Sequence, residues 1–198
     1  MEDVLDRAFG RPRGVLGRIG AALMARGNAA VEQQVVDIAG VRDDETVLVL
    51  GPGPGVGLRA AGERAAAAIG VDPSEDMLRI SARRCADLVR AGTVRIRKAT
   101  AEQTGLEDES VDVALTVNNV HIWSDRAAGF AEIARVLRPG GRIVLSVHQK
   151  FLPVTRHQLA SEVETAGFTD VQSWTWDPPG VLATRAVQLR AVKKAVNA

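Results

Sequence analysis

The amino-acid sequence predicts an α/β fold with a mostly parallel sheet, and three observations support this prediction. Short apolar segments alternate with helical segments through five units, which is typical of a parallel sheet covered by helices. The segments 47–50 and 111–117 are almost wholly apolar, as expected of strands buried on both faces. The last two predicted strands are joined by the short turn 177–180 (DPPG), so they form an antiparallel closing hairpin.

The first half of the chain contains an N-terminal helical segment, three predicted strands and the two helices that join them. Residues 1–40 lie outside the alternation and suggest two helices with Asn28 as a cap between them; the amphipathic stretch 9–26 is a candidate lid. Ser74 is a predicted N-cap, because its hydroxyl can accept a backbone hydrogen bond and two acids follow it. The core elements expected here are a strand over Val47–Leu50, a helix over Leu58–Ala68, a strand over Ile69–Asp72, a helix from Ser74 to about Arg90 and a strand over Val94–Lys98.

The second half continues the alternation and ends in the hairpin. The spacing of Thr155 and Gln158 predicts a capping box at the start of a helix. The segment 138–141 (RPGG) is expected to end the helix before it. The expected elements are a strand over Val111–Val117, a helix capped by Ser124 and reaching about Leu137, a strand over Arg142–Val147, a helix from Thr155 to about Ala166, and strands over Val171–Trp176 and Val181–Leu189.

Length and composition predict one globular domain over 1–198, with 1–40 as the helical lid segment and 41–198 as the core. The chain is 46% hydrophobic and 25% charged, which excludes disordered and fibrous classes. A net charge of +1 gives no electrostatic footprint for nucleic acid. The lone Cys85, three scattered histidines and short apolar runs predict no disulfide, metal site or membrane span. We expect a cytoplasmic protein that is a monomer or a homodimer.

A glycine-rich loop and a later acid predict a nucleoside site. The loop 51–57 (GPGPGVG) follows a predicted strand and precedes a helix, so its backbone can approach a ligand closely. The next strand ends at Asp72, 21 residues after Gly51, where a carboxylate can accept hydrogen bonds from both ribose hydroxyls. Together these features indicate an adenosine-containing ligand at the carboxyl ends of the strands.

The spacing within the loop distinguishes between nucleotide ligands. A dinucleotide fingerprint needs a third small residue, but that place holds Val56 when counted from Gly51 and Leu58 when counted from Gly53. The Gly-Lys-Ser/Thr ending of a phosphate-binding loop is absent from the sequence. The loop therefore suits a nucleoside without phosphates, and an NAD-dependent oxidoreductase is disfavoured.

Four segments in order resemble a known family. VLVLGPGPGVG, IGVDPSEDML, KATAEQTGLEDESVDVALTVNNVHIW and RVLRPGGRIVLS are similar to the successive motifs of class I S-adenosylmethionine-dependent methyltransferases, in the small-molecule branch called methyltransferase type 11. The resemblance covers about Val47 to Ser146. It implies a Rossmann-like, seven-stranded fold. It also implies S-adenosyl-L-methionine as cofactor and S-adenosyl-L-homocysteine as product.

The resemblance also implies roles for individual residues around the cofactor. The implied contacts are the loop residues Gly51, Pro52, Gly53 and Gly55 under methionine and ribose, Asp72 at the ribose hydroxyls, Pro73 and Met77 flanking the adenine, Thr100, Ala101 and Glu102 at the adenine edge, and Asn118 and Asn119 beside the sulfonium. The sequence departs from the family at Val49 and Thr100, where the family usually carries acids. We therefore expect cofactor binding weaker than the family norm by about tenfold or more.

The resemblance implies methyl transfer to a small-molecule acceptor, at oxygen or nitrogen, by in-line displacement. Two candidate general bases lie at the ligand-binding edge, His121 beyond the fourth strand and His148 at the end of the fifth. Loop histidines are also common as structural hydrogen-bonding groups, and that alternative stays open. The loop NNVH differs from the Asn/Asp-Pro-Pro-Tyr loop of amino-directed enzymes acting on nucleic acids and protein amides. A second hypothesis is a non-catalytic binder of nucleosides or S-adenosylhomocysteine with the same fold.

Overall fold

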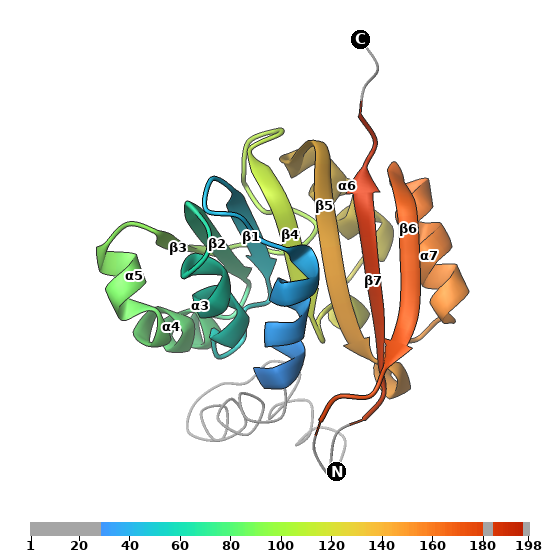
Figure 1. Cartoon of the computed structure of the whole chain (residues 1–198), viewed down its shortest axis with the longest axis horizontal. Helices are drawn as coiled ribbons and strands as arrows, with labels where there is room; N and C mark the ends of the chain where they lie inside the picture. Colours follow the sequence, from blue (N-terminus) through green and yellow to red (C-terminus); the bar gives the residue numbers. More distant parts are fainter. Residues whose placement is uncertain (1–28, 180–183, 196–198) are drawn as a thin grey trace.

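The computed structural model describes residues 29–179 and 184–195, and these build one seven-stranded sheet (Figure 1). The strand order is β3-β2-β1-β4-β5-β7-β6. Strands β1 to β5 run parallel, and β7 is antiparallel to both β5 and β6. The predicted mostly parallel sheet with a closing hairpin is thus confirmed. The strands are β1 (Thr46–Leu50), β2 (Ala67–Asp72), β3 (Val94–Lys98), β4 (Val111–Val117), β5 (Leu137–His148), β6 (Phe168–Trp176) and β7 (Ala186–Lys193).

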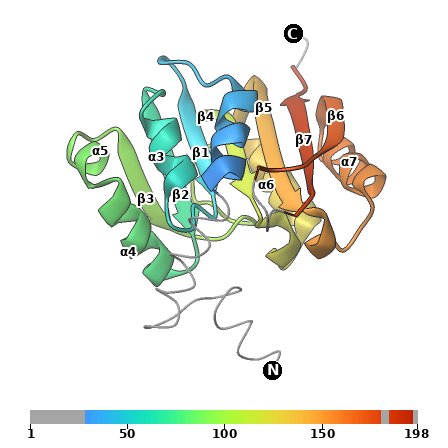
Figure 2. The same cartoon turned by 60° about the horizontal axis from the view of Figure 1, so that its bottom comes forward.

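Helices cover both faces of the sheet (Figures 1 and 2). The helix over residues 29–39, α3 (Val56–Gly62), α4 (Glu75–Arg84) and α5 (Ala86–Arg90) lie on the face that carries Val47 and Val49. The other face, which carries Leu48 and Leu50, is covered by α6 (Arg126–Val136) and α7 (Arg156–Thr165). Single turns η2 (Val120–Ile122) and η3 (Gln149–Phe151) follow β4 and β5. Because β1 to β5 are parallel, their carboxyl ends gather at one edge.

Two predicted helix boundaries are wrong. The helix predicted over Leu58–Ala68 ends at Gly62, and Ala67 and Ala68 belong to β2. A Cβ at Gly62 would lie 2.6 Å from Val94, so the helix here packs tightly on the sheet. Parallel pairing with β1 and β3 outweighs the helix propensity of the alanines. The next predicted helix divides at Cys85 into α4 and α5.

The caps of the helices were predicted with mixed success. Ser74 caps α4 as predicted, accepting a hydrogen bond from Met77 N, and the capping box at Thr155 and Gln158 is confirmed. The cap of α6 is Asp125 rather than Ser124, because Asp125 Oδ1 accepts from Ala128 N at 3.0 Å. The amide of Ser124 donates to Glu102 instead.

One closing strand is longer than predicted, and the other is shifted along the chain. β6 begins at Phe168 rather than Val171, and β7 runs over Ala186–Lys193 rather than 181–189. Positions 181–183 lie outside the described residues. α6 ends at Val136, just before the segment 138–141, close to the predicted end. That segment belongs to β5, which begins at Leu137 rather than at the predicted Arg142 and pairs with β4 through a register shift between Val111 and Val113, with Gly140 at φ +77°. Pairing with β5 on one side and β6 on the other determines the extent of β7.

The predicted N-terminal elements fall partly outside the described residues. The candidate lid 9–26 and the cap Asn28 lie there, whereas residues 29–39 form the second predicted helix. The buried guanidinium of Arg142 on β5 anchors the end of this helix, because it donates to the carbonyls of Ala39 and Gly40 and pairs with Glu45 at 2.8 Å. Within 29–179 and 184–195, no helix is long and apolar enough to span a bilayer.

Candidate active site

The glycine loop joins β1 to α3 at the carboxyl edge of the sheet. Gly51, Gly53 and Gly55 have φ angles of +60°, +49° and +86°, a region that L side chains rarely adopt. A Cβ at Gly53 would meet open space, and one at Gly51 would lie 1.5 Å from Nδ2 of the Asn119 side chain. Because neither glycine has a side chain, the backbone leaves an open space at Gly53, called the cradle below. At Gly51 it lets the side chain of Asn119 lie against the loop.

Side chains of α4 fasten this loop from behind. Ser81 Oγ donates to the carbonyl of Gly53 at 2.7 Å, and Arg84 Nε donates to the carbonyl of Pro54 at 2.8 Å. Within the loop, Gly55 N donates to the carbonyl of Pro52 at 2.7 Å, and Gly51 N donates to Val71 of the next strand at 2.8 Å. These four hydrogen bonds tie the glycine loop to α4, to β2 and to itself.

Asp72 ends β2 beside the loop and is 8% exposed. Its Oδ1 accepts a hydrogen bond from Ser74 N at 2.8 Å. Burial raises the pKa of Asp72 to about 6, although the bond from Ser74 opposes this shift. Pro73 is exposed and Met77 is buried in the first turn of α4. A buried carboxylate followed by Pro73 and Met77 fits the predicted ribose and adenine contacts.

The segment after β3 is more closely tied to the next loop than predicted. Ala101 packs in the core, and Thr100 is exposed. Glu102 Oε1 accepts from the amides of Ser124 at 2.8 Å and Asp125 at 3.2 Å. Burial would raise the pKa of Glu102, but these bonds and others from its own amide and Thr100 together lower it. The carboxylate of Glu102 thus orients the start of α6.

The two asparagines after β4 hold the neighbouring loops in place. Asn118 adopts φ +49°, and its Oδ1 accepts from the amide of His148 at 2.9 Å. Asn119 Oδ1 accepts from Trp123 Nε1 at 2.5 Å, and its amide nitrogen lies against Gly51. Trp123 packs edge-on against Phe130, so this side chain anchors the loop to the core. Both asparagines bring the β4 loop toward β1 and β5.

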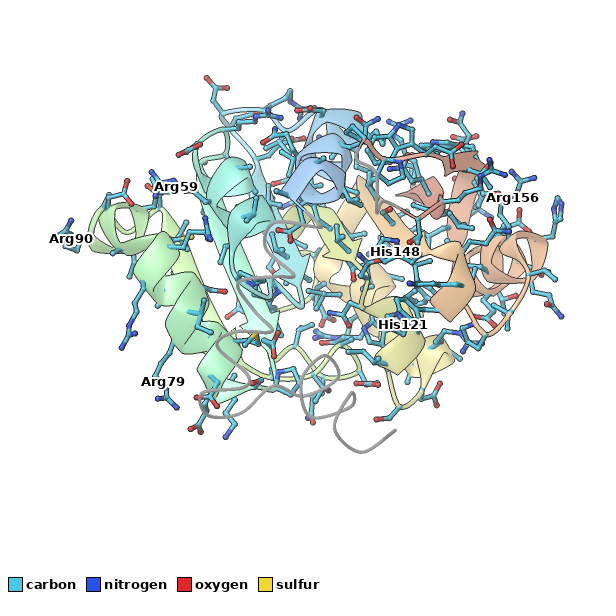
Figure 3. All side chains as sticks on the ribbon, turned by 90° about the horizontal axis from the view of Figure 1, so that it is seen from below. Arg59, Arg79, Arg90, His121, His148 and Arg156 are labelled. Carbon is cyan, nitrogen blue, oxygen red and sulfur yellow. The ribbon has the colours of Figure 1, made fainter. Side chains whose placement is uncertain are left out.

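The two predicted histidines lie in the same part of the molecule (Figure 3), and both contact the exposed ring of Phe151. His121 stacks on Phe151 with ring centroids 5.4 Å apart, and His148 meets the same ring edge-on at 5.9 Å. Burial lowers the pKa of His121, and the nearby His148 lowers it further. Burial lowers the pKa of His148, and Lys150 adds to this, while the carbonyl of Thr184 acts against it. Both imidazoles are therefore neutral near pH 7.

His121 has one unsatisfied atom and His148 is held in place. Nδ1 of His121 is buried without a hydrogen-bond partner in the described part of the chain. Nδ1 of His148 lies 2.8 Å from the hydroxyl of Thr184. A buried imidazole nitrogen without a hydrogen bond destabilises the folded protein, and a hydrogen bond to a polar ligand or a water offsets that cost. His121 is thus the histidine of the pair with an atom left for a ligand.

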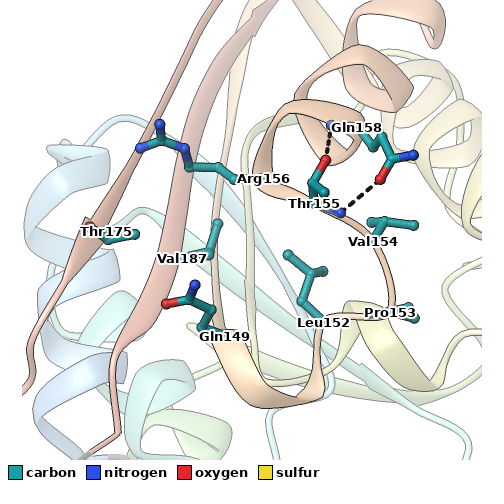
Figure 4. A pocket seen from close by; sticks show the side chains of 9 residues that line it. All are labelled: Gln149, Leu152, Pro153, Val154, Thr155, Arg156, Gln158, Thr175 and Val187. Atoms are coloured by element: carbon teal, nitrogen blue, oxygen red, sulfur yellow. Dashed lines mark hydrogen bonds between the residues drawn. The ribbon is translucent and has the colours of Figure 1, made fainter.

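A cavity of about 650 Å³ lies between η3, the start of α7 and the hairpin (Figure 4). Gln149, which directly follows His148, lines it. Its other lining residues are Leu152, Pro153, Val154, Thr155, Arg156, Gln158, Thr175 and Val187. This volume is large enough for a small molecule, and the mixture of apolar, amide and cationic groups suits a polar one.

Sequence reasoning missed two side chains at this edge. Phe151 is 48% exposed between the histidines, and only the folded structure brings it there. Glu32, on the helix over 29–39, is 8% exposed, and its Oε2 accepts from Gly57 N at 2.5 Å. Glu32 stands 25 residues before its partner, in a segment without a motif, so no sequence signal marks it.

The residues present fit S-adenosylmethionine. The cradle at Gly53, the buried carboxylate of Asp72 and the polar β4 loop lie on neighbouring strand ends. They match a ligand with an unphosphorylated nucleoside and a short polar tail. The described residues contain no group of three His, Cys, Asp or Glu side chains able to hold a metal ion.

Comparisons with known proteins agree with this site. The family model of the methyltransferase domain matches residues 48–145. The uncharacterized methyltransferase YdaC of Bacillus subtilis is 28% identical over 162 residues, which cover 77% of this chain and 87% of the relative. The uncharacterized methyltransferase Mb3374 of Mycobacterium bovis is 37% identical over 123 residues, or 61% of this chain. The match spans 46% of the mycobacterial relative.

A solved structure shows the same fold. The Haemonchus contortus phosphoethanolamine N-methyltransferase 2, in complex with phosphomonomethylethanolamine and S-adenosylhomocysteine, superposes with a TM-score of 0.78 at 17% identity. The superposition covers 97% of this chain and 59% of that one. The glycine loop, the matched domain and the named relatives agree on one cofactor, S-adenosylmethionine. The chain belongs to the class I S-adenosylmethionine-dependent methyltransferases.

Proposed function

We propose that this methyltransferase acts on a small-molecule acceptor at oxygen or nitrogen, with His121 as the general base. One observation carries the proposal. Two neutral histidines flank an exposed phenyl ring at the same sheet edge as the glycine loop. An aromatic and imidazole surface of this kind packs against an organic acceptor and can take up its proton.

The chain's own residues divide the work around the acceptor. The bound cofactor supplies a methyl group already activated on its sulfonium. Phe151 packs against the acceptor, and the imidazole of His121 receives the proton that the acceptor's hydroxyl or ammonium group loses. Asn118 and Glu102 hold the surrounding backbone through His148, Ser124 and Asp125. The cavity beside Gln149 gives room for the remote part of the acceptor.

The relatives support an enzyme over a non-catalytic binder. The similar proteins carry methyltransferase names, and the neighbouring structure holds a small phosphorylated amine with S-adenosylhomocysteine. The second hypothesis of the sequence, a binder without turnover, gains no support from these comparisons.

The test is acceptor-dependent formation of S-adenosylhomocysteine. The protein is incubated with methyl-labelled S-adenosylmethionine and separate panels of phenols, aliphatic alcohols, amines and oligonucleotides, and label and product are measured by mass spectrometry. We expect label on an oxygen or nitrogen of a small molecule. Label on carbon, on sulfur or on the oligonucleotides would overturn the proposal, as would cofactor binding without transfer to any panel.

A further inference from the structure

Glu32 is a carboxylate in an apolar position directly behind the glycine loop. It lies on the helix over residues 29–39, and its neighbours Val35 and Val36 on that helix are buried. Together with Val49, Gly51 and Val117 it lines a cavity of about 10 Å³. That volume is about the size of one water molecule. The buried carboxylate therefore borders the glycine loop beside this small cavity.

The known partner of Glu32 does not account for a charge at this place. Its Oε2 accepts one backbone hydrogen bond from Gly57, which a neutral amide oxygen could accept equally well. Burial raises the pKa of Glu32 to about 7, while the bond from Gly57 and the charge of Arg84 oppose this. Arg84 of α4, whose Nε donates to the carbonyl of Pro54, is the charged group that acts on Glu32 among the described residues. Burying an ionisable group costs free energy unless a partner compensates it.

The cofactor brings cations to this loop. Its methionine part carries an α-ammonium and a sulfonium, whereas its adenosine part is uncharged. We propose that Glu32 is the electrostatic partner of the methionine α-ammonium of S-adenosylmethionine, behind Gly51. This inference rests on the cofactor and is independent of the acceptor proposed above.

This role changes the expectation attached to Val49. The family usually carries an acid at the position of Val49, so this sequence lacks a negative charge there. The carboxylate of Glu32 lines the same 10 Å³ cavity as Val49. The negative charge then comes from a helix outside the strand-helix alternation. The anchoring of residues 39 and 40 by Arg142 fixes the far end of that helix, so Glu32 is held at a constant distance from the loop.

The proposal predicts a proton linkage. A cation beside Glu32 favours its ionised form, so cofactor binding releases a proton at pH values below about 7. Affinity for a ligand with the α-ammonium therefore rises as pH increases through about 7. Asp72, with its pKa near 6, changes the affinity of every adenosine ligand in a similar direction, so a ligand without the amino acid part corrects for it.

The test compares two ligands and two variants by calorimetric titration. S-adenosylhomocysteine carries the α-ammonium, and 5′-methylthioadenosine lacks the amino acid part. In E32Q, which keeps an acceptor for Gly57, we expect S-adenosylhomocysteine to bind about tenfold or more weakly and methylthioadenosine to change less than about twofold. The matched control D37N removes an exposed carboxylate from the same helix and should leave both affinities unchanged.

Two results would overturn the proposal. Equal weakening of both ligands in E32Q would show that Glu32 only shapes the loop, and an unchanged affinity for S-adenosylhomocysteine would show that its charge is unused. If E32Q does not fold, the wild-type protein still decides. The ratio of the two affinities must then rise in favour of S-adenosylhomocysteine between pH 6 and pH 8, and a constant ratio contradicts the proposal. None of these measurements depends on methyl transfer, so they stand apart from the test of the acceptor.

Discussion

The two halves of the ligand-binding edge are built in different ways. On the β1–β2 side, backbone carbonyls of the glycine loop accept hydrogen bonds from two side chains of α4, the buried Ser81 and the exposed Arg84. On the β4–β5 side, Ile122 and Phe151 are about half exposed, and both histidines pack against the ring of Phe151. A cofactor of constant chemistry suits a backbone site formed in advance. The proposed acceptor side is built from side chains, and side chains are where specificity can vary within one fold.

The largest expected effect is on the rate of methyl transfer, with cofactor binding left unchanged. We expect H121A to lower kcat by about 10³-fold, because general bases contribute about 10² to 10⁴ to the rate. Affinity for S-adenosylhomocysteine, measured by calorimetry, should change less than about twofold. H157A, at an exposed position on α7, is the control. Because burial lowers the pKa of His121, the wild-type rate should fall only when pH drops below 6.5. A loss of kcat below about fivefold in H121A would remove His121 as the base.

The next effect breaks the cofactor side. D72A should bind S-adenosylhomocysteine about a hundredfold more weakly, because it loses ribose hydrogen bonds to a carboxylate worth about 1.5 to 3 kcal/mol each. Its thermal unfolding should stay cooperative. The control D112N alters a carboxylate at the opposite end of the sheet, where Asp112 accepts from Thr46 N at 2.7 Å. Wild-type affinity should fall as pH drops through about 6, where Asp72 becomes protonated. Unchanged affinity in D72A would show that the ribose does not bind at Asp72.

A smaller effect tests whether the exposed ring belongs to the acceptor side. F151A should raise the KM of the acceptor about tenfold, because a phenyl ring contributes about 1.5 to 3 kcal/mol when covered. The KM of S-adenosylmethionine should stay constant. V89A removes another exposed apolar side chain, on α5, and serves as the control. If F151A shifts the KM of the cofactor instead, the two halves of the edge are not separate.

The smallest effect tests how firmly the glycine loop must be held. S81A removes the hydrogen bond to the carbonyl of Gly53 and should weaken S-adenosylhomocysteine about fivefold, as expected for one bond of about 1 kcal/mol. The control S161A changes an exposed serine of α7. Affinity in S81A equal to that of the wild type would show that the loop keeps its shape without α4.

The fold was predictable where one physical signal dominates. β3 and β4 match their predicted ranges, β3 because its apolar and charged residues alternate and β4 because it is almost wholly apolar. The end of α3 was not predictable, because alanines favour a helix locally and join β2 only through pairing with β1 and β3. The cap of α6 depends on Glu102 taking the amide of Ser124, a contact across 22 residues.

The candidate site divides in the same way. The glycine loop and Asp72 are visible in the sequence because backbone geometry demands glycine and a strand end locates the acid. The roles of Glu32 and Phe151 depend on how separate elements pack, and composition or spacing cannot show that. The proposed cofactor contacts of Asn118, Asn119 and Glu102 remain predictions, and the structure adds that each of these side chains also holds a neighbouring loop.

The most direct measurement is a parallel calorimetric titration of the protein with S-adenosylmethionine, S-adenosylhomocysteine and NAD. The nucleoside site expected at Gly53 and Asp72 predicts one-to-one binding of both sulfur nucleosides and no binding of NAD, because the loop spacing does not admit a pyrophosphate. Binding of NAD in competition with S-adenosylhomocysteine, or no binding of either sulfur nucleoside, would contradict the account.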